Sequence, residues 1–291
     1  MNTTIPQLQL SNGFKIPKIG FGTWKMGKGR EYGPSDNHHG EVAIIRKAVE
    51  LGMCHVDSAE MYGAGFVEEM IAQALEGIDR SEYMLTSKVA GGNATEDGIK
   101  QAIEGTLSRL KVDYLDLYLI HWRVQSIDLE ESINAMNSLV DEGLVKHIGV
   151  SNFHPDTLAK AQEYSKHPIV NDQVQYNLKH REAEANGLVD YCQNNDTILT
   201  AWGPMHPIDD STSELGLIKE FTQKYNATPG QLALSYLISQ KNICTLAKTT
   251  SQKHLKENIA AASLVMDQED LDRIKDQFPD QVMKSPTMPM S

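Results

Sequence analysis

Short apolar runs alternate with amphipathic segments along almost the whole chain, mostly at intervals of about 30 residues. The intervening segments, such as GEVAIIRKAVELG and EDGIKQAIEGTLSRL, repeat apolar residues at i, i+3, i+4 and i+7, the spacing of one helix face. Eight such strand–helix units predict a closed α/β structure, a (β/α)8 TIM barrel. The alternative is a doubly wound open sheet. The apolar runs begin at Lys18, Cys54, Tyr83, Tyr114, Lys146, Ile169, Thr197 and Ile243.

Three segments do not fit the simple repeat. The stretch LQLSNGFKIP places Asn12-Gly13 between two short runs, which predicts a β-hairpin before the barrel, closing its bottom. Two further helical patterns, SELGLIKEFTQKYN and DQEDLDRIKDQF, follow the seventh strand and the eighth helix. Because no linker-like composition interrupts the chain, we expect residues 1–291 to form a single barrel domain.

Charge and composition exclude several classes of function. The formal net charge is −12, which argues against nucleic acid or an anionic membrane as partner, because both need clustered cations. No apolar run approaches the length of a membrane span, and the N-terminus lacks the features of a signal peptide. Cys54, Cys192 and Cys244 are far apart, which predicts reduced core residues of a cytoplasmic protein, not a disulfide framework or a metal site.

Polar residues follow nearly every predicted strand. In a barrel of this kind the catalytic groups sit where the strands end, and this rule selects Asp57, Lys88, His121, Trp122, Ser151, Asn152, Gln173, Trp202, Lys248 and Thr249, with Tyr62 in a loop. A solitary polar residue at a strand end is usually a solvated turn residue, but their coincidence on one rim favours a functional site. Burying Lys88 without a partner would be costly, so we expect Asp57 to pair with it. The ammonium would lower the pKa of Tyr62 from about 10.

Seven stretches of the chain together resemble the aldo-keto reductase family. Each is weakly specific alone, whereas all of them in this order are highly specific. They are GFGTW, HVDSAEMYG, LTSKV, SRLKVDYLDLYLIHW, GLVKHIGVSNF, QVQYN and AKTTSQKHLKEN.

The resemblance places the catalytic tetrad of the family on Asp57, Tyr62, Lys88 and His121. It implies hydride transfer from a nicotinamide cofactor to an aldehyde or ketone. Tyr62 would donate the proton to the carbonyl oxygen, and Lys88, held by Asp57, would tune Tyr62 toward working pH. His121 would orient the carbonyl by a hydrogen bond.

The resemblance also implies that the cofactor lies extended across the barrel mouth. Ser151, Asn152 and Gln173 would bind the carboxamide of the nicotinamide, and Trp202 would stack on its ring. Lys248 and Thr249 would meet an anionic group before a helix.

Glu257 and Asn258 would face the adenine, and His254 stands where many NADPH-preferring members carry arginine. Because Lys248 is retained, we still expect NADPH to be preferred, but His254 narrows the margin over NADH, the alternative.

Trp24, Met61 and Trp122 flank the tetrad and are predicted to form an apolar substrate pocket, with Tyr32 and the loop GKGREYGPSDNHHG at its rim. Short specificity loops predict an open pocket for small carbonyl compounds such as methylglyoxal and for aromatic aldehydes. The resemblance suggests a monomer, although nothing in the chain decides its oligomeric state.

Two other functions are weighed against a reductase. One is a cofactor-binding regulatory subunit of the same fold. The other is a barrel hydrolase that uses Asp57 and Glu60 as an acid pair, which leaves Lys88 unexplained.

Overall fold

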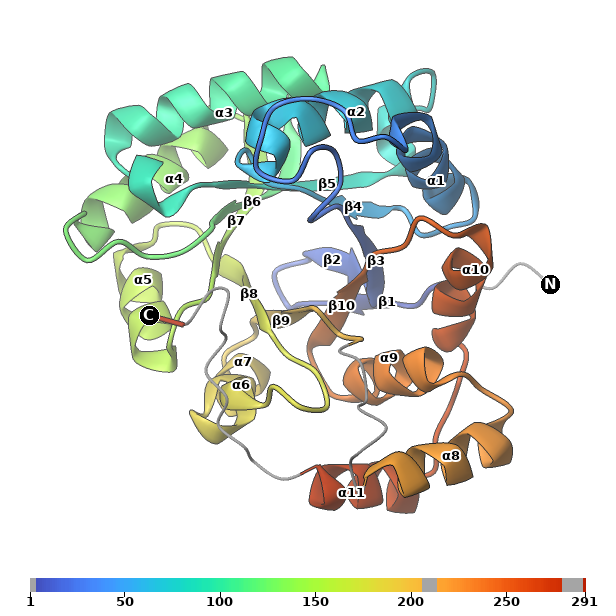
Figure 1. Ribbon diagram of the computed structural model, residues 1–291. Helices are drawn as coiled ribbons and strands as arrows, with labels where there is room; N and C mark the ends of the chain where they lie inside the picture. Colours follow the sequence, from blue (N-terminus) through green and yellow to red (C-terminus); the bar gives the residue numbers. More distant parts are fainter. Residues whose placement is uncertain (1–3, 206–213, 279–289) are drawn as a thin grey trace.

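The computed structural model describes residues 4–205, 214–278 and 290–291, and its centre is a closed barrel of eight parallel strands (Figure 1). The last strand pairs with the first at Thr245 and Ile19, and this closure rules out the open-sheet alternative. The predicted barrel is thereby confirmed. Its strands are β3 (Ile19–Gly22), β4 (His55–Asp57), β5 (Met84–Val89), β6 (Leu115–Ile120), β7 (Val145–Ser151), β8 (Ile169–Gln175), β9 (Ile198–Trp202) and β10 (Ile243–Ala247).

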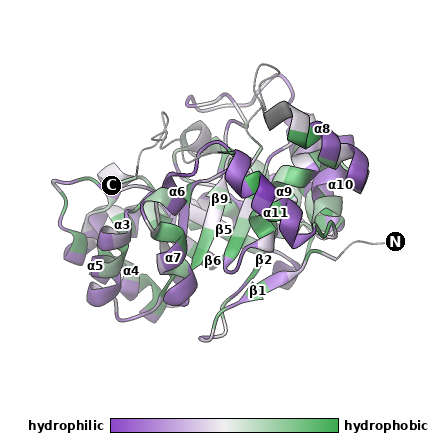
Figure 2. Cartoon of the chain, turned by 90° about the horizontal axis from the view of Figure 1, so that it is seen from below, coloured by the Kyte–Doolittle hydropathy of each residue, from purple (hydrophilic) through white to green (hydrophobic). Residues whose placement is uncertain are grey.

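Helices surround the barrel and place their apolar faces on it (Figure 2). In α3 (Glu96–Leu110) the buried residues include Ile99, Ile103 and Leu110, which have the spacing of one helix face. Thr95 begins this helix by accepting a hydrogen bond from the N–H of Gly98 at 3.2 Å. The other helices that follow strands are α1 (His38–Glu50), α2 (Phe66–Leu75), α4 (Leu129–Asp141), α5 (Pro155–Tyr164), α6 (Glu182–Ala185), α7 (Leu188–Asn194), α9 (Pro229–Ser239) and α10 (Gln252–Ala261).

The two predicted additional helices are present as α8 (Glu214–Tyr225) and α11 (Gln268–Gln277), which lie side by side at the periphery (Figure 1). Lys224 of α8 pairs with Asp270 of α11 at 2.6 Å, and Arg273 pairs with Glu220 at 2.8 Å. Among the described residues, no helix combines the length and the apolar character needed to cross a membrane.

The predicted hairpin is formed by β1 (Gln7–Gln9) and β2 (Lys15–Pro17), and it closes the bottom of the barrel. Its buried side chains Leu10, Phe14 and Ile16 form one apolar cluster with Leu117 and Ile198, which stand near the beginnings of their strands. The hairpin therefore covers the end of the barrel from which the strands start.

Polar side chains form a second layer further along the barrel. His55 Nε2 lies 2.9 Å from the hydroxyl oxygen of Thr86, and Asn171 donates to the hydroxyl of Thr200 at 2.6 Å. A Cβ atom on Gly20 would lie only 2.5 Å from His55 Nδ1, so glycine makes room for this imidazole. Side chains alternate between the two faces of a strand, so a residue two positions after one of these also points into the barrel. Asp57, Lys88 and Gln173 follow His55, Thr86 and Asn171 in this way, and they lie nearer the upper end of the barrel.

Candidate active site

A buried ion pair lies at the upper end of the barrel. Lys88 Nζ donates to Asp57 Oδ1 at 2.7 Å and to the carbonyl of Ser58 at 2.6 Å. The amide of Gln173 donates to the other carboxylate oxygen of Asp57 at 2.8 Å. Burial lowers the pKa of Lys88, and the Asp57 carboxylate opposes that lowering. The pairing of Lys88 with Asp57 expected from the strand ends is present in the structure.

Tyr62 lies beside this pair because the chain turns sharply after β4. The turn is a 3-10 segment, η1 (Tyr62–Gly65), in which Gly63 and Ala64 have left-handed backbone angles (φ 56° and 49°). The Tyr62 and His121 rings pack edge to face, with their centroids 5.8 Å apart. Lys88 Nζ lies 5.1 Å from the centroid of the Tyr62 ring.

The expected lowering of the Tyr62 pKa is wrong for this structure. Burial, and then the Asp57 carboxylate, raise the pKa of Tyr62 well above 10 because both disfavour a phenolate. The ammonium group of Lys88, which is bound to Asp57 and Ser58, does not reverse this rise of the pKa. Tyr62 therefore keeps its proton at neutral pH.

His121 directly follows β6, where its backbone N–H donates to the carbonyl of Val89 at 2.9 Å. Burial and the nearby charge of Lys88 hold the pKa of His121 well below 6.5. The imidazole is consequently neutral and has one N–H available as a hydrogen-bond donor.

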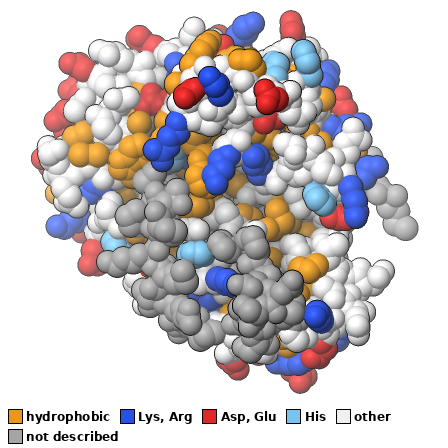
Figure 3. Space-filling view, in the orientation of Figure 1, with side chains coloured by type: hydrophobic (Ala, Val, Ile, Leu, Met, Phe, Trp, Pro, Cys, Tyr) orange, Lys and Arg blue, Asp and Glu red, His pale blue; other side chains and the backbone are white. Residues whose placement is uncertain are grey.

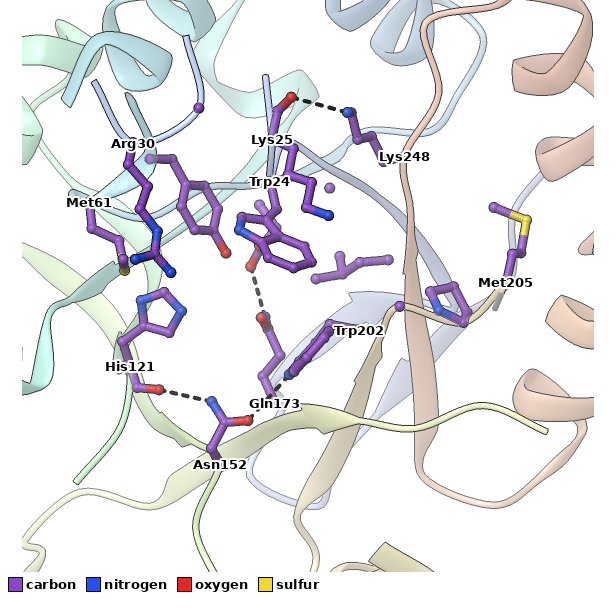
Figure 4. Close-up of a pocket in the computed structure, with 17 residues that line it drawn as sticks. Trp24, Lys25, Arg30, Met61, His121, Asn152, Gln173, Trp202, Met205 and Lys248 are labelled. Atoms are coloured by element: carbon purple, nitrogen blue, oxygen red, sulfur yellow. Dashed lines mark hydrogen bonds between the residues drawn. The ribbon is translucent and has the colours of Figure 1, made fainter. Parts of the chain in front are cut away.

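A cavity of about 260 Å³ opens above these groups, and Asp57, Tyr62 and His121 contribute to its wall (Figure 4). Trp24 and Met61 line it, as predicted. Trp122 does not. Its ring lies 5.0 Å from the ring of His121, and a Cβ atom on Gly91 would lie 2.6 Å from the indole. The chain has left β6 before Trp122, so strand alternation does not determine the direction of its side chain.

The sequence left several wall residues unassigned. Gly29 and Arg30 belong to the predicted rim loop, whereas Tyr32 turns away and donates to Glu69 at 2.9 Å. The signal for Arg30 was its position in a polar loop directly after a strand. The other unassigned wall residues are Gly22, Lys25, Gly203, Pro204, Met205 and Leu246.

Three of the four residues predicted to meet a nicotinamide line the cavity: Asn152, Gln173 and Trp202. Asn152 has a left-handed backbone (φ 62°), and its side chain donates to the carbonyl of His121 at 3.0 Å and accepts from the Trp202 indole at 3.3 Å. Ser151 is buried behind them and donates to the carbonyl of Gln173 at 2.6 Å. Ser151 thus supports the wall from behind.

Lys248 is the predicted adenine-end residue that lines the cavity, where burial lowers its pKa and Nζ donates to the carbonyl of Lys25 at 3.2 Å. Thr249 is buried and forms the turn before α10 by accepting from the N–H of Ser251 at 3.0 Å. The remaining predicted residues lie on α10, outside the cavity wall: His254 is exposed, Glu257 is half-buried and Asn258 is buried.

Glu60 does not form an acid pair with Asp57. Its carboxylate accepts hydrogen bonds from the N–H of Ala90 at 2.6 Å and from the side chain of Asn93 at 3.0 Å. Glu60 is therefore a turn residue that fastens two loops together, and the geometry gives no support to the hydrolase alternative. In the part of the chain that the structure describes, no three His, Cys, Asp or Glu side chains are arranged to hold a metal ion.

Comparison with known proteins agrees with this geometry. The model of the Aldo/keto reductase family matches residues 18–277. The methylglyoxal reductase YeaE of Escherichia coli is 30% identical over 276 residues, which are 94% of each chain. The uncharacterized oxidoreductase YtbE of Bacillus subtilis is 33% identical and covers 91% of this chain and 90% of its own.

Solved structures extend the likeness to three dimensions. The thermostable aldo-keto reductase Tm1743, in complex with the inhibitor epalrestat, superposes with a TM-score of 0.90 at 35% identity, over 94% of this chain and 100% of its own. An aldo/keto reductase of Klebsiella pneumoniae, in complex with NADP and acetate, superposes with a TM-score of 0.84 at 30% identity. The match covers 98% of this chain and 99% of that reductase. The expected enzyme class, an oxidoreductase, is confirmed, and the chain belongs to the aldo/keto reductase family.

Proposed function

We propose that this protein reduces small aldehydes and ketones to alcohols with NADPH. The observation that carries the proposal is that a protonated Tyr62 and a neutral His121 share one cavity wall above the buried Lys88–Asp57 pair. A proton donor and a hydrogen-bond donor at one point suit the reduction of a carbonyl group. The bound nicotinamide supplies the hydride.

Each of these residues has a distinct role. Tyr62 gives its hydroxyl proton to the carbonyl oxygen as negative charge develops there. Lys88, 5.1 Å from the ring centroid, places a positive charge near the phenolate that Tyr62 becomes, and Asp57 holds that ammonium group in position. His121 donates a hydrogen bond to the same carbonyl oxygen and orients the substrate.

The described residues fit an extended dinucleotide. Asn152, Gln173 and the flat indole of Trp202, supported by Ser151, would hold the nicotinamide end of the cofactor. Lys248 brings a cation to the other end of the cavity.

On α10 the buried side-chain nitrogen of Asn258 has no hydrogen-bond partner within the described structure, which suits a polar ligand. We propose that Asn258 and Glu257 meet the adenine, and that Thr249 contributes at the adjoining turn.

His254 sets the margin between the two nicotinamide cofactors. An exposed imidazole can pack on the adenine but lacks the fixed charge of arginine, so Lys248 alone favours a 2′-phosphate. We expect a higher kcat/KM with NADPH than with NADH, and a wider preference in His254→Arg. A preference of the unaltered protein for NADH would contradict the assignment of Lys248.

Methylglyoxal and aromatic aldehydes are the proposed substrates. The cavity is modest in size, and Trp24, Met61 and Trp202 give it apolar walls. The named methylglyoxal reductase of E. coli, which is 30% identical, supports this choice.

The decisive experiment is Tyr62→Phe, assayed by NADPH consumption with methylglyoxal and a panel of aromatic aldehydes. We expect turnover to fall about 10²- to 10⁴-fold, with NADPH binding measured by tryptophan fluorescence retained. Tyr32→Phe is the matched control, because the Tyr32 hydroxyl binds Glu69 outside the cavity wall.

Near-normal turnover in Tyr62→Phe would contradict the role of this hydroxyl. An unaltered protein that binds NADPH but consumes none with any aldehyde would instead be the regulatory subunit. The single domain over residues 1–291, the cytoplasmic location and the monomeric state stay predictions, the last of which sedimentation analysis can test.

A further inference from the structure

Arg30 lies in the cavity wall close to the reactive groups. It belongs to the loop between β3 and α1, and its guanidinium group points toward the His121 ring, beside Met61 (Figure 4). Lys248 and Met205 lie at the opposite side of the same cavity (Figure 4). Lys25 is the third cation of this wall. Arg30 and Lys248 therefore lie at different ends of the site, with Arg30 at the end where a carbonyl substrate would react.

The loop fixes this position through its backbone. Gly29 has a left-handed backbone (φ 75°), and its carbonyl accepts a hydrogen bond from the N–H of Gly63 at 3.0 Å. Gly29 directly precedes Arg30 and Gly63 directly follows Tyr62, so this bond ties the arginine to the turn that carries the tyrosine. The N–H of Lys28 also donates to the carbonyl of Gly33 at 3.1 Å and closes the loop.

Arg30 has no ion pair within the described structure, although the chain as a whole has a net charge of −12. Four acidic residues of the loop, of the flanking helices and of the cavity bind other groups. In the loop, Glu31 pairs with Lys28 at 2.8 Å. On the flanking helices, Glu41 accepts a hydrogen bond from the N–H of Gly27 at 3.0 Å, and Glu69 accepts one from Tyr32 at 2.9 Å. In the cavity, Asp57 pairs with Lys88 at 2.7 Å.

Arg30 is exposed to solvent at the edge of the cavity and has no ion pair with a described carboxylate, so it is available to a carboxylate from outside. The planar guanidinium group binds a carboxylate with two parallel hydrogen bonds, which fixes orientation as well as position. Figure 3 shows Lys and Arg side chains gathered near the centre of this face, over the barrel mouth. A positive mouth on an acidic protein attracts anions selectively.

We infer that Arg30 determines substrate specificity by binding a carboxylate group of the substrate, so that carbonyl compounds bearing a carboxylate are preferred over neutral ones. This inference rests on the proposed function and names the substrate class of that same site. The carboxylate binds Arg30 while the carbonyl oxygen meets Tyr62 and His121.

A matched pair of aldehydes tests the inference: 4-formylbenzoate and its neutral methyl ester, each with NADPH. We expect the unaltered protein to show the higher kcat/KM with 4-formylbenzoate. In Arg30→Met that value should fall about 10- to 100-fold, mainly through KM, because a hydrogen bond to a charged group is lost. The value for the ester should change by less than about 3-fold, and Arg30→Lys should recover part of the loss.

Two measurements separate this role from others. Lys28→Met removes a cation of the same loop that lies outside the cavity wall. The value of kcat/KM should then be unchanged for both substrates. The affinity for NADPH, measured by tryptophan fluorescence, should be the same in Arg30→Met as in the unaltered protein.

Equal losses for acid and ester, weakened NADPH binding, or no preference for the acid in the unaltered protein would each overturn the inference while leaving the reductase intact. Failure of the unaltered protein to reduce either aldehyde, or any member of the wider panel, would overturn the proposed function and the inference together.

Discussion

The two ends of the barrel are built from the same strands, but apolar side chains fill the bottom and buried charged groups lie at the top. At the bottom, Phe14 and Leu117 are packed among apolar side chains, and burial of such groups stabilises the fold. At the top, Asp57 and Lys88 are buried as charges, an arrangement that contributes little net stability. β6 supplies Leu117 near one end and is followed by His121 at the other. The division of labour therefore depends on position along a strand, and not on which strand is used.

Removing the charge at the top should have the largest effect. In Lys88→Met we expect turnover to fall about 10²- to 10⁴-fold, because the phenolate of Tyr62 loses its nearby cation. The free energy of unfolding should fall by about 3–5 kcal/mol, since the buried Asp57 carboxylate is left uncompensated. Steady-state kinetics and urea unfolding measure the two effects.

The double variant Asp57→Asn, Lys88→Met separates them. Replacing both charges should restore most of the stability, because no unpaired charge remains buried, but turnover should stay low. Recovery of turnover together with stability would show that the pair is merely structural.

At the bottom the same kind of test should give the opposite result. Phe14 is almost fully buried, and Phe14→Ala should lower the free energy of unfolding by about 3–5 kcal/mol through lost burial and a cavity. Below the unfolding transition, kcat and KM should stay within about 2-fold of their original values, because the active groups lie at the far end. A large loss of kcat in fully folded Phe14→Ala would show that the two ends are coupled.

This contrast also marks how far the sequence could predict the structure. The eight strands, the closing hairpin and the pairing of Lys88 with Asp57 follow from alternation and from the parallel order of neighbouring strands. These are regular features, and a regular pattern in the sequence reports them. The assignment of Tyr62 and His121 needed the family resemblance in addition.

Irregular features were out of reach. The raised pKa of Tyr62 depends on the depth of its burial and on the nearby Asp57 carboxylate, and a sequence pattern reports neither the depth nor the distance. Trp122 was misplaced because the chain has left the strand at that point. Arg30 was missed because its loop is shaped by a left-handed glycine and by a bond to the distant Gly63.

His55 lies between the two ends, and we expect it to make the free energy of unfolding depend on pH, by less than the changes above. Burial lowers the pKa of His55 to about 4, whereas an unfolded histidine has a pKa of about 6.5. Between these values the unfolded chain binds a proton that the folded chain does not, so the contribution of His55 to stability is lost as pH falls below about 6.5. At pH 5 the loss should be roughly 2 kcal/mol relative to pH 7.

The measurement is urea unfolding of the unaltered protein and of His55→Gln at both pH values. Other buried groups titrate in the same range: His121 acts in the same direction, and Asp172, whose pKa burial raises to about 8, acts in the opposite one. Both are present in both proteins, so only the difference between the two proteins isolates His55. That difference should shrink or reverse in favour of His55→Gln on going from pH 7 to pH 5, because glutamine does not titrate. An unchanged difference would mean that His55 already carries its proton inside the barrel, and the middle layer would then belong with the charged top of the barrel instead of with its neutral bottom.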